Sequence, residues 1–222
     1  MAAVRWYPAK GIEKARWRPL KAADSKLLFP VNDPSATFSV LDDQHIEMRS
    51  TGVSLLRLGQ PLLGTFSFDV SLDPQKSEGS GVFFRGQRVE QSITFQTLEF
   101  GHESSSNGQE PRLLWSRWSA DLSNNDPGDS PPAARELLAS VAIESASEPS
   151  LHQLQINCGQ RAMPEVHWNG VPLPHAKWKL SAAGQAVQAT PFAQLPTAFL
   201  GNLGLMNLGG SCVFEEPRLA YQ

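Results

Sequence analysis

Apolar and polar residues alternate with a period of two along much of this chain. The stretch TFSFDVSL places Phe66, Phe68 and Val70 on one side and Ser67 and Asp69 on the other. Successive side chains of a strand point to opposite faces, so this pattern predicts a half-buried antiparallel strand. The same alternation predicts strands at 37–42, 45–50, 53–58, 92–100, 112–120, 151–157, 164–170 and 211–221.

Clusters of polar, glycine and proline residues separate these runs. They include 73–81, 101–111, 123–132 and the Asn169-Gly170 pair, all typical of turns. Many short strands with turns between them predict an all-β fold, a two-sheet antiparallel jelly-roll sandwich.

The chain has 222 residues and no linker that divides it, so we expect a single domain over residues 1–222. Residues 1–33 alternate poorly, and we expect them to form an irregular lead-in that wraps the sandwich. The stretch AARELLASVAIESAS at 133–147 has a composition that also suits a helix. We favour a strand there, with a short helical or irregular lead-in.

The charge balance narrows the classes of partner. With 19 Lys and Arg against 22 Asp and Glu the net charge is -3, which argues against nucleic acid as a ligand. No apolar run reaches the roughly 18 residues that cross a membrane, so no membrane insertion is expected. The first residues lack the apolar region of a signal peptide, and location stays open between the cytoplasm and export within a larger protein.

Cysteine and histidine spacing predicts no metal or cofactor. Cys158 and Cys212 lie far apart, without a C-x-x-C motif, and are interpreted as two buried thiols, although one disulfide is allowed. The five histidines do not cluster, so no metal site is predicted. One loop with carboxylate and amide side chains could hold a structural calcium ion: Asn124, Asn125, Asp126 and Asp129.

Three segments in this order resemble a known group of proteins. They read TFSFDVSLDPQKSEGSGVFFRG, LHQLQINCGQRAMPEVHWNGVPL and GNLGLMNLGGSCVFEEPRLA. Together they resemble the concanavalin A-like lectin/glucanase superfamily, and within it the 3-keto-disaccharide hydrolase-like domains of bacteria. The resemblance implies a jelly roll with a concave face that can hold sugars, as a module of a larger bacterial protein.

Departures from the family pattern bear on catalysis. Thr94 stands where the family usually has a carboxylate, and Glu215 and Glu216 replace an arginine and an asparagine. We therefore predict a non-catalytic carbohydrate-binding or interaction module. The alternative is a glycoside-active hydrolase or lyase of the 3-keto-disaccharide type, which would use Glu90 or Glu99 together with Arg85. A purely protein-binding sandwich is the third interpretation.

Candidate ligand contacts centre on the stretch GSGVFFRG. If Val82 and Phe84 face the core, strict alternation places Phe83 and Arg85 on the other face, with Gln96 of the next strand as a neighbour. A guanidinium beside an aromatic ring and an amide suits recognition of sugar hydroxyls. The alternative is that Arg85 closes the sheet with a salt bridge.

Tryptophans are the other candidates, because an exposed indole can stack on the apolar face of a sugar ring. Trp115 and Trp118 are three positions apart and should lie on opposite faces of one strand. We expect one of them in the core, and name Trp118 and Trp168 as ligand-binding candidates; Trp178 is similar.

Overall fold

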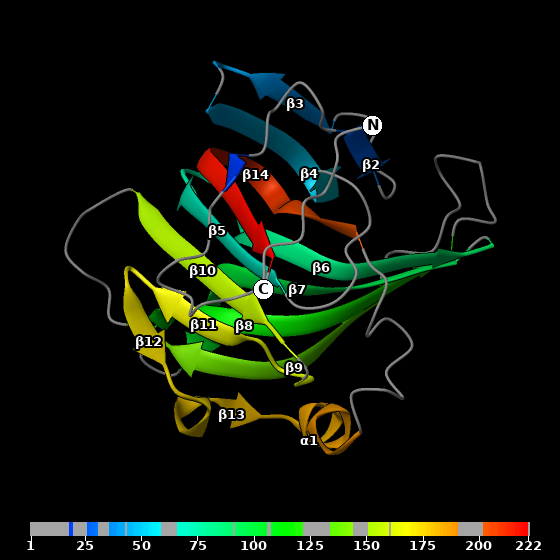
Figure 1. The fold of residues 1–222 in the computed structure, drawn as a ribbon, viewed down its shortest axis with the longest axis vertical. Coiled ribbons are helices and arrows are strands. Elements are labelled where there is room, and N and C mark those ends of the chain that lie inside the picture. The colour runs from blue at the N-terminus through cyan, green and yellow to red at the C-terminus, as the bar shows by residue number, and fades with distance from the viewer. Residues whose placement is uncertain are drawn as a thin grey trace.

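A computed structural model of the chain describes residues 18–19, 26–30, 36–42, 44–58, 66–90, 92–105, 108–121, 134–143, 151–159, 161–190 and 202–221. Within these residues the chain forms antiparallel strands, one short 3-10 helix and one α-helix (Figure 1). No helix in this part of the chain is long and apolar enough to cross a membrane.

In the described residues, hydrogen bonding joins all the strands into one continuous 14-stranded sheet, which folds over itself into two layers. One layer, which we call sheet A, has the strand order β12-β11-β10-β5-β14-β4-β3, with β1 beside β14. Its strands are β1 (Arg18–Pro19), β3 (Thr37–Val40), β4 (His45–Arg57), β5 (Phe66–Asp73), β10 (His152–Cys158), β11 (Glu165–Trp168), β12 (Val171–Leu173) and β14 (Asn202–Tyr221).

The other layer, sheet B, has the order β2-β4-β14-β6-β7-β8-β9-β13. The strands not yet given are β2 (Lys26–Pro30), β6 (Gly79–Val89), β7 (Ser92–Ser105), β8 (Gly108–Asp121), β9 (Ala134–Ala142) and β13 (Lys179–Leu180).

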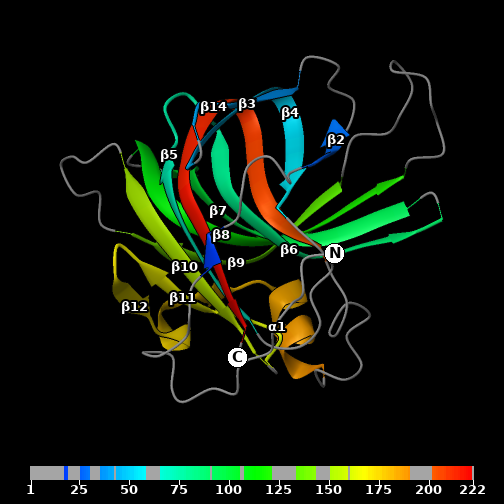
Figure 2. The ribbon, with the colours of Figure 1, turned by 45° about the horizontal axis from the view of Figure 1, so that its top comes forward.

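The two long strands β4 and β14 belong to both layers. The first part of β14 pairs with β6 through Asn202 to Leu208, and its second part pairs with β5 through Val213 to Tyr221 (Figure 2). A bulge between Leu208 and Gly210 separates the two parts, and Gly209 and Gly210 have φ values of 62° and 69° there. Those angles favour glycine, because other residues are strained at positive φ.

The core lies between the two sheets. Sheet A contributes the alternating apolar residues of β5, and Phe68 and Leu72 are fully buried. Sheet B contributes Phe84, Leu98 and Trp115 to the same cluster, all with no exposed surface. The predicted all-β, two-sheet antiparallel jelly roll is confirmed.

Several element boundaries differ from the predictions. The expected strands at 45–50 and 53–58 are one strand, β4, because both halves pair with β14 across Thr51 and Gly52. Residues 101–111, expected as a loop, extend β7 and β8, which stay paired as far as Ser105 and Gly108. The strand expected at 211–221 begins at Asn202. In each case hydrogen bonding to a neighbouring strand outweighs local polarity.

Residues 134–142 form the favoured strand, β9. The α-helix lies elsewhere, at α1 (Ala182–Ala189), where the sequence analysis predicted none. Ser181 caps it by accepting a hydrogen bond from the Gly184 backbone N–H at 3.0 Å. At Gly184 a Cβ would lie 2.0 Å from the Leu138 carbonyl oxygen, so only glycine lets α1 approach β9 this closely. Figure 1 shows α1 and β13 along the β9 edge of sheet B.

The predicted Asn169-Gly170 turn and the two cysteines can be compared with the structure. The Asn169-Gly170 turn is confirmed between β11 and β12, with φ values of 50° and 76°. Cys158 and Cys212 are both free and buried, as expected, and burial raises the pKa of the Cys158 thiol to about 12.

The remaining predictions concern the lead-in, metals and calcium. Two short strands, β1 and β2, fall within the lead-in that was expected to be irregular. The rest of residues 1–33 and the proposed calcium loop at 124–129 lie outside the described residues. Among the described residues, no group of three or more His, Cys, Asp or Glu side chains is placed to hold a metal ion.

Candidate functional site

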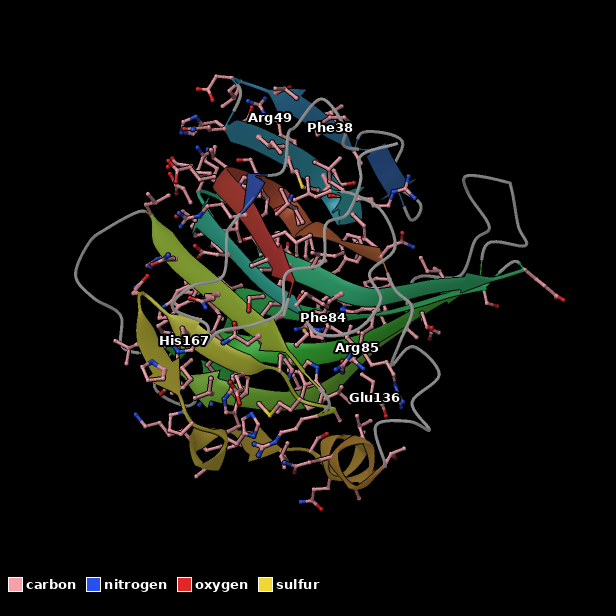
Figure 3. All side chains as sticks on the ribbon, in the orientation of Figure 1. Phe38, Arg49, Phe84, Arg85, Glu136 and His167 are labelled. Carbon is pink, nitrogen blue, oxygen red and sulfur yellow. The ribbon has the colours of Figure 1, made fainter. Side chains whose placement is uncertain are left out.

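Arg85 lies on the core face of sheet B, and the prediction that it shares a face with Phe83 is wrong. Phe84 pairs with Gln96, and Gln87 pairs with Thr94. Between these pairs, Arg85 and Gly86 of β6 stand opposite the single residue Phe95 of β7. This bulge, with Arg85 at a φ of 54°, interrupts the alternation of faces. The guanidinium therefore lies 5.7 Å from the centre of the Phe84 ring, and Figure 3 shows the two side chains next to each other.

The Arg85 side chain connects the two sheets. Its Nη2 donates to the Arg161 carbonyl oxygen at 2.9 Å, and its Nη1 donates to the Ala162 carbonyl oxygen and to Gln96 Oε1, the latter at 3.3 Å. Gln96 is thus the expected neighbour, and it also accepts a hydrogen bond from Trp115 Nε1. Because Arg85 is only 5% exposed, this geometry gives no support to direct ligand contact.

Phe83 and Trp118 lie on the outer face of sheet B, the face turned away from sheet A. Trp115 and Trp118 do lie on opposite faces, as predicted, but Trp118 is only 4% exposed. Its ring stacks on Phe95 at 6.0 Å, and Phe83 meets Phe95 edge to face. An apolar cluster forms this face: Val53, Leu55, Phe83, Ile93, Phe95, Trp118 and Met206. The expectation of an exposed indole at Trp118 is therefore wrong.

Trp168 belongs to the main core. Its indole stacks on Phe100 at 5.5 Å and on His152 at 4.9 Å, and these two rings are 5.2 Å from each other. The Trp168 residue is 6% exposed. Trp178 is equally buried in the same cluster. Neither indole offers a free face for stacking on a sugar ring.

A polar group on the outer face combines a carboxylate, a guanidinium and two hydroxyls. We call Glu99, Thr97, Ser116, Trp118 and Arg135 the Glu99 cluster. Arg135 forms an ion pair with Glu99 Oε1, and the same oxygen accepts a hydrogen bond from Ser116 Oγ at 3.2 Å. Arg135 Nε donates to Ser116 Oγ at 3.2 Å, and its guanidinium lies 5.5 Å over the Trp118 ring. Trp118 Nε1 donates to Thr97 Oγ1 at 3.0 Å.

Burial sets the electrostatics of this cluster. The Glu99 side chain is 1% exposed, and loss of hydration raises its pKa, while Arg135 and Ser116 act in the opposite direction. The Oε2 atom of Glu99 is buried, and no residue in the described part of the chain forms a hydrogen bond with it. Such an atom is uncommon in a folded protein and marks the place as a candidate site.

The Arg135 side chain is 31% exposed and reaches solvent at the end of the cluster. A pocket of about 350 Å³, the β7–β9 pocket, opens there over three adjacent strands. Its lining residues are Thr94, Arg117, Ser119, Ala134, Arg135 and Glu136. Among the described residues, only Arg135 belongs to both this pocket and the Glu99 cluster.

The rest of the pocket has polar residue types, most of its exposed surface is apolar, and it is open to solvent. Arg117 Nε donates to Glu136 Oε2 at 3.0 Å, and both side chains are about half exposed. Thr94 and Ser119 are exposed and paired across β7 and β8. The alternation of faces places them with Arg117 and Glu136, on the face opposite to Trp118 and Arg135. Sequence reasoning named Glu99 but missed Arg135, which comes 36 residues later in the chain.

The two carboxylates considered for catalysis are far apart. Glu90 lies exposed in the turn before β7, with a φ of 53°. Glu99 lies roughly 23 Å along β7 from the start of that strand, at about 3.3 Å per residue. A pair of carboxylates that cleaves one glycosidic bond needs a separation of about 5 to 9.5 Å. Glu90 and Glu99 therefore do not form such a pair.

Comparison with known proteins adds only distant structural similarity. No family model matches the chain, and no curated protein matches it. Among solved structures, the carbohydrate-binding module CBM66 from Bacillus subtilis has 10% identity and a TM-score of 0.49, over 85% of this chain and 94% of that one. A Bacillus subtilis protein of unknown function with a galectin-like fold has 9% identity and a TM-score of 0.47, over 92% and 94%.

The carbohydrate recognition domain of Emp47p has 11% identity and a TM-score of 0.48, over 96% of this chain and 99% of that one. These values identify no shared site residue, so the fold is assigned from the strand pairing of this chain. The narrower resemblance to 3-keto-disaccharide hydrolase-like domains stays a prediction.

Proposed function

We propose that this chain is a non-catalytic carbohydrate-binding module that holds a saccharide in the β7–β9 pocket, with Arg117 and Glu136 as its central contacts. The observation that carries the proposal is the pocket itself, where a guanidinium, a carboxylate and two hydroxyls lie on one face of three paired strands.

The residue types of the pocket suit a sugar. Each sugar hydroxyl both donates and accepts hydrogen bonds, and the pocket offers both partners. The Arg117 guanidinium supplies a planar set of donors, Glu136 supplies acceptors, and Thr94 and Ser119 supply hydroxyls that do both. A few placed polar groups in a hollow are typical of small-molecule sites.

Rigidity favours binding at this position. All lining residues lie on three paired strands rather than on loops, so little conformational freedom is lost when a ligand binds.

The arrangement of carboxylates supports binding over hydrolysis. Glu99 is occupied by Arg135, and Glu90 is too distant to act with it on one bond. The hydrolase or lyase alternative therefore has no supporting geometry among the described residues.

Glycan-array binding of the wild-type chain and the Arg117→Ala variant tests the proposal. Arg117 lines the pocket but is half exposed and forms only a surface ion pair, so its loss should leave the fold intact. Arg49→Ala is the matched control, because Arg49 forms an exposed ion pair with Glu47 on sheet A at 2.8 Å.

We expect at least one glycan to bind, a loss of affinity of roughly tenfold in Arg117→Ala, and no change in Arg49→Ala, with thermal unfolding equal in all three. An array without binding, or equal binding by Arg117→Ala and wild type, would contradict the proposal.

A further inference from the structure

A second pocket, of about 330 Å³, lies at the β11–β12 hairpin on sheet A. Its lining includes Arg161, Glu165, His167, Pro172, Leu173 and His175, and we call it the β11–β12 pocket. We propose that it is a second saccharide-binding site, separate from the β7–β9 pocket. Figure 3 places His167 of this pocket and Glu136 of the other well apart in the molecule.

The histidines provide polar atoms with defined roles. His175 Nε2 lies 3.3 Å from the Pro164 carbonyl oxygen, which can only accept, so Nε2 carries the proton. In the neutral ring Nδ1 is then an acceptor. The Nδ1 atom of His167 is buried and has no hydrogen-bond partner among the described residues. A ligand hydroxyl would satisfy an atom that the described part of the chain leaves without one.

The rim of the pocket is fixed by the other sheet. Arg161 has an exposed side chain, but its carbonyl oxygen and that of Ala162 both accept hydrogen bonds from the buried Arg85 guanidinium. The segment that presents Arg161 is thus attached to β6 of sheet B. This attachment preorganises the rim, so less conformational entropy is lost when a ligand binds.

Amide groups continue the polar surface next to the pocket. Asn157 pairs with Glu165 and Gln155 pairs with His167, so each amide lies on the same face of sheet A as its partner. Gln155 Nε2 donates to Asn157 Oδ1 at 3.3 Å, yet Asn157 Nδ2 is buried without a partner, and the residue is only 6% exposed. A second unsatisfied polar atom therefore lies beside the pocket, on a neighbouring strand.

The combination of groups favours a neutral saccharide over a simple anion. The Glu165 carboxylate offsets the charge of Arg161, so the rim has both donors and acceptors but no excess of positive charge. Pro172 and Leu173 give the pocket an apolar wall, which suits the C–H face of a sugar ring. Only the choice of ligand class depends on the proposed function; the site itself is argued from its own residues.

NMR titration of the isotope-labelled full chain tests this site. The probes are cellohexaose, laminarihexaose, xylohexaose and a fructo-oligosaccharide, and the signals are the imidazoles of His167 and His175 and the Nε–H groups of Arg117 and Arg135. We expect at least one oligosaccharide to change the chemical shifts of both the histidine and the arginine signals. Arg161→Ala should weaken the histidine response at least tenfold and leave the arginine response unchanged. Lys177→Ala is the control, because Lys177 is an exposed cation close by that does not line the pocket.

The outcomes separate the two proposals. Shifts confined to Arg117 and Arg135 would overturn the second site and leave the proposed function in place. Shifts confined to His167 and His175, sensitive to Arg161→Ala, would support the second site and overturn the β7–β9 assignment. No shift with any probe, or equal responses of Arg161→Ala and wild type, would overturn the second site.

Discussion

Two arginines of sheet B, one on each face, use their guanidinium groups differently. Arg85 is 5% exposed and donates to two main-chain carbonyl oxygens and an amide oxygen. The Arg135 side chain is 31% exposed, pairs with a buried carboxylate and lines a pocket. Arg85 connects parts of the fold, whereas Arg135 has an exposed edge that a ligand can reach.

The difference follows from the partners. Main-chain carbonyls from a loop surround Arg85, so its donors are consumed inside the protein. Glu99 and Ser116 contact Arg135 on the outer face, and 31% of the Arg135 side chain stays exposed. For these two arginines, therefore, the partners that the fold supplies decide whether the guanidinium is enclosed or reaches solvent.

The largest expected effect comes from removing Arg135. Arg135→Ala leaves the Glu99 carboxylate buried without its cation, and we expect a loss of about 3–5 kcal/mol in the free energy of unfolding at pH 7. Urea unfolding measures it. The double variant Arg135→Ala with Glu99→Gln should regain part of the loss, because no charge is then buried. A loss below about 1 kcal/mol would show that Glu99 does not depend on Arg135.

Arg85→Met should cost less, about 2–3 kcal/mol, because it leaves the Arg161 and Ala162 carbonyls without their donors. Urea unfolding again gives the value, with Arg49→Met as the surface control, expected to change stability by under about 1 kcal/mol. If Arg85→Met and Arg49→Met had equal free energies of unfolding, Arg85 would contribute no more to stability than the surface residue Arg49.

A pH series sharpens the contrast at Glu99. Burial raises the folded-state pKa of Glu99 above its ordinary value of 4.5, so the folded chain keeps a proton that the unfolded chain has lost. The wild type should therefore lose stability relative to Glu99→Gln as the pH rises from about 4.5 through the raised pKa. Urea unfolding of both proteins between pH 4 and 8 measures this difference. A wild type that gains stability over this range would mean that Arg135 outweighs burial.

The smallest effect is a change in thiol reactivity near Arg85. Burial raises the pKa of Cys158 to about 12, so its thiol stays protonated at pH 8 and should react very slowly with iodoacetamide. Arg85→Met should speed this labelling several-fold by releasing the segment at Arg161 and Ala162; mass spectrometry follows the modification. Unchanged rates would indicate that this segment stays in place without Arg85.

The sequence predicted strands wherever one face is buried and the ladder is regular. The alternation of Phe66, Phe68 and Val70 translates directly into the inner face of β5. The alternation pattern predicted the wrong face for Arg85. A bulge is a property of two paired strands, so the sequence of one strand does not reveal it. Trp118 was placed on the correct face, but its burial depends on Phe95 and on packing over the outer face.

The candidate site was only half visible in the sequence. Glu99 stands in the apolar run TFQTLEF, where a carboxylate among buried positions is itself a signal of function. Its partner Arg135 comes from a segment with the composition of a helix, and only the pairing of β8 with β9 brings the two together. The helix α1 had a usable signal that was missed, a serine cap before an alanine-rich stretch.

The long strand β14 has a consequence for how this protein is made. It supplies pairing partners for β4, β5 and β6, all of which leave the ribosome more than a hundred residues earlier. These three strands must wait, with apolar faces unprotected, until β14 has been synthesised. Folding of the sandwich is therefore expected to be largely post-translational, and chaperones that shield nascent chains should raise its yield.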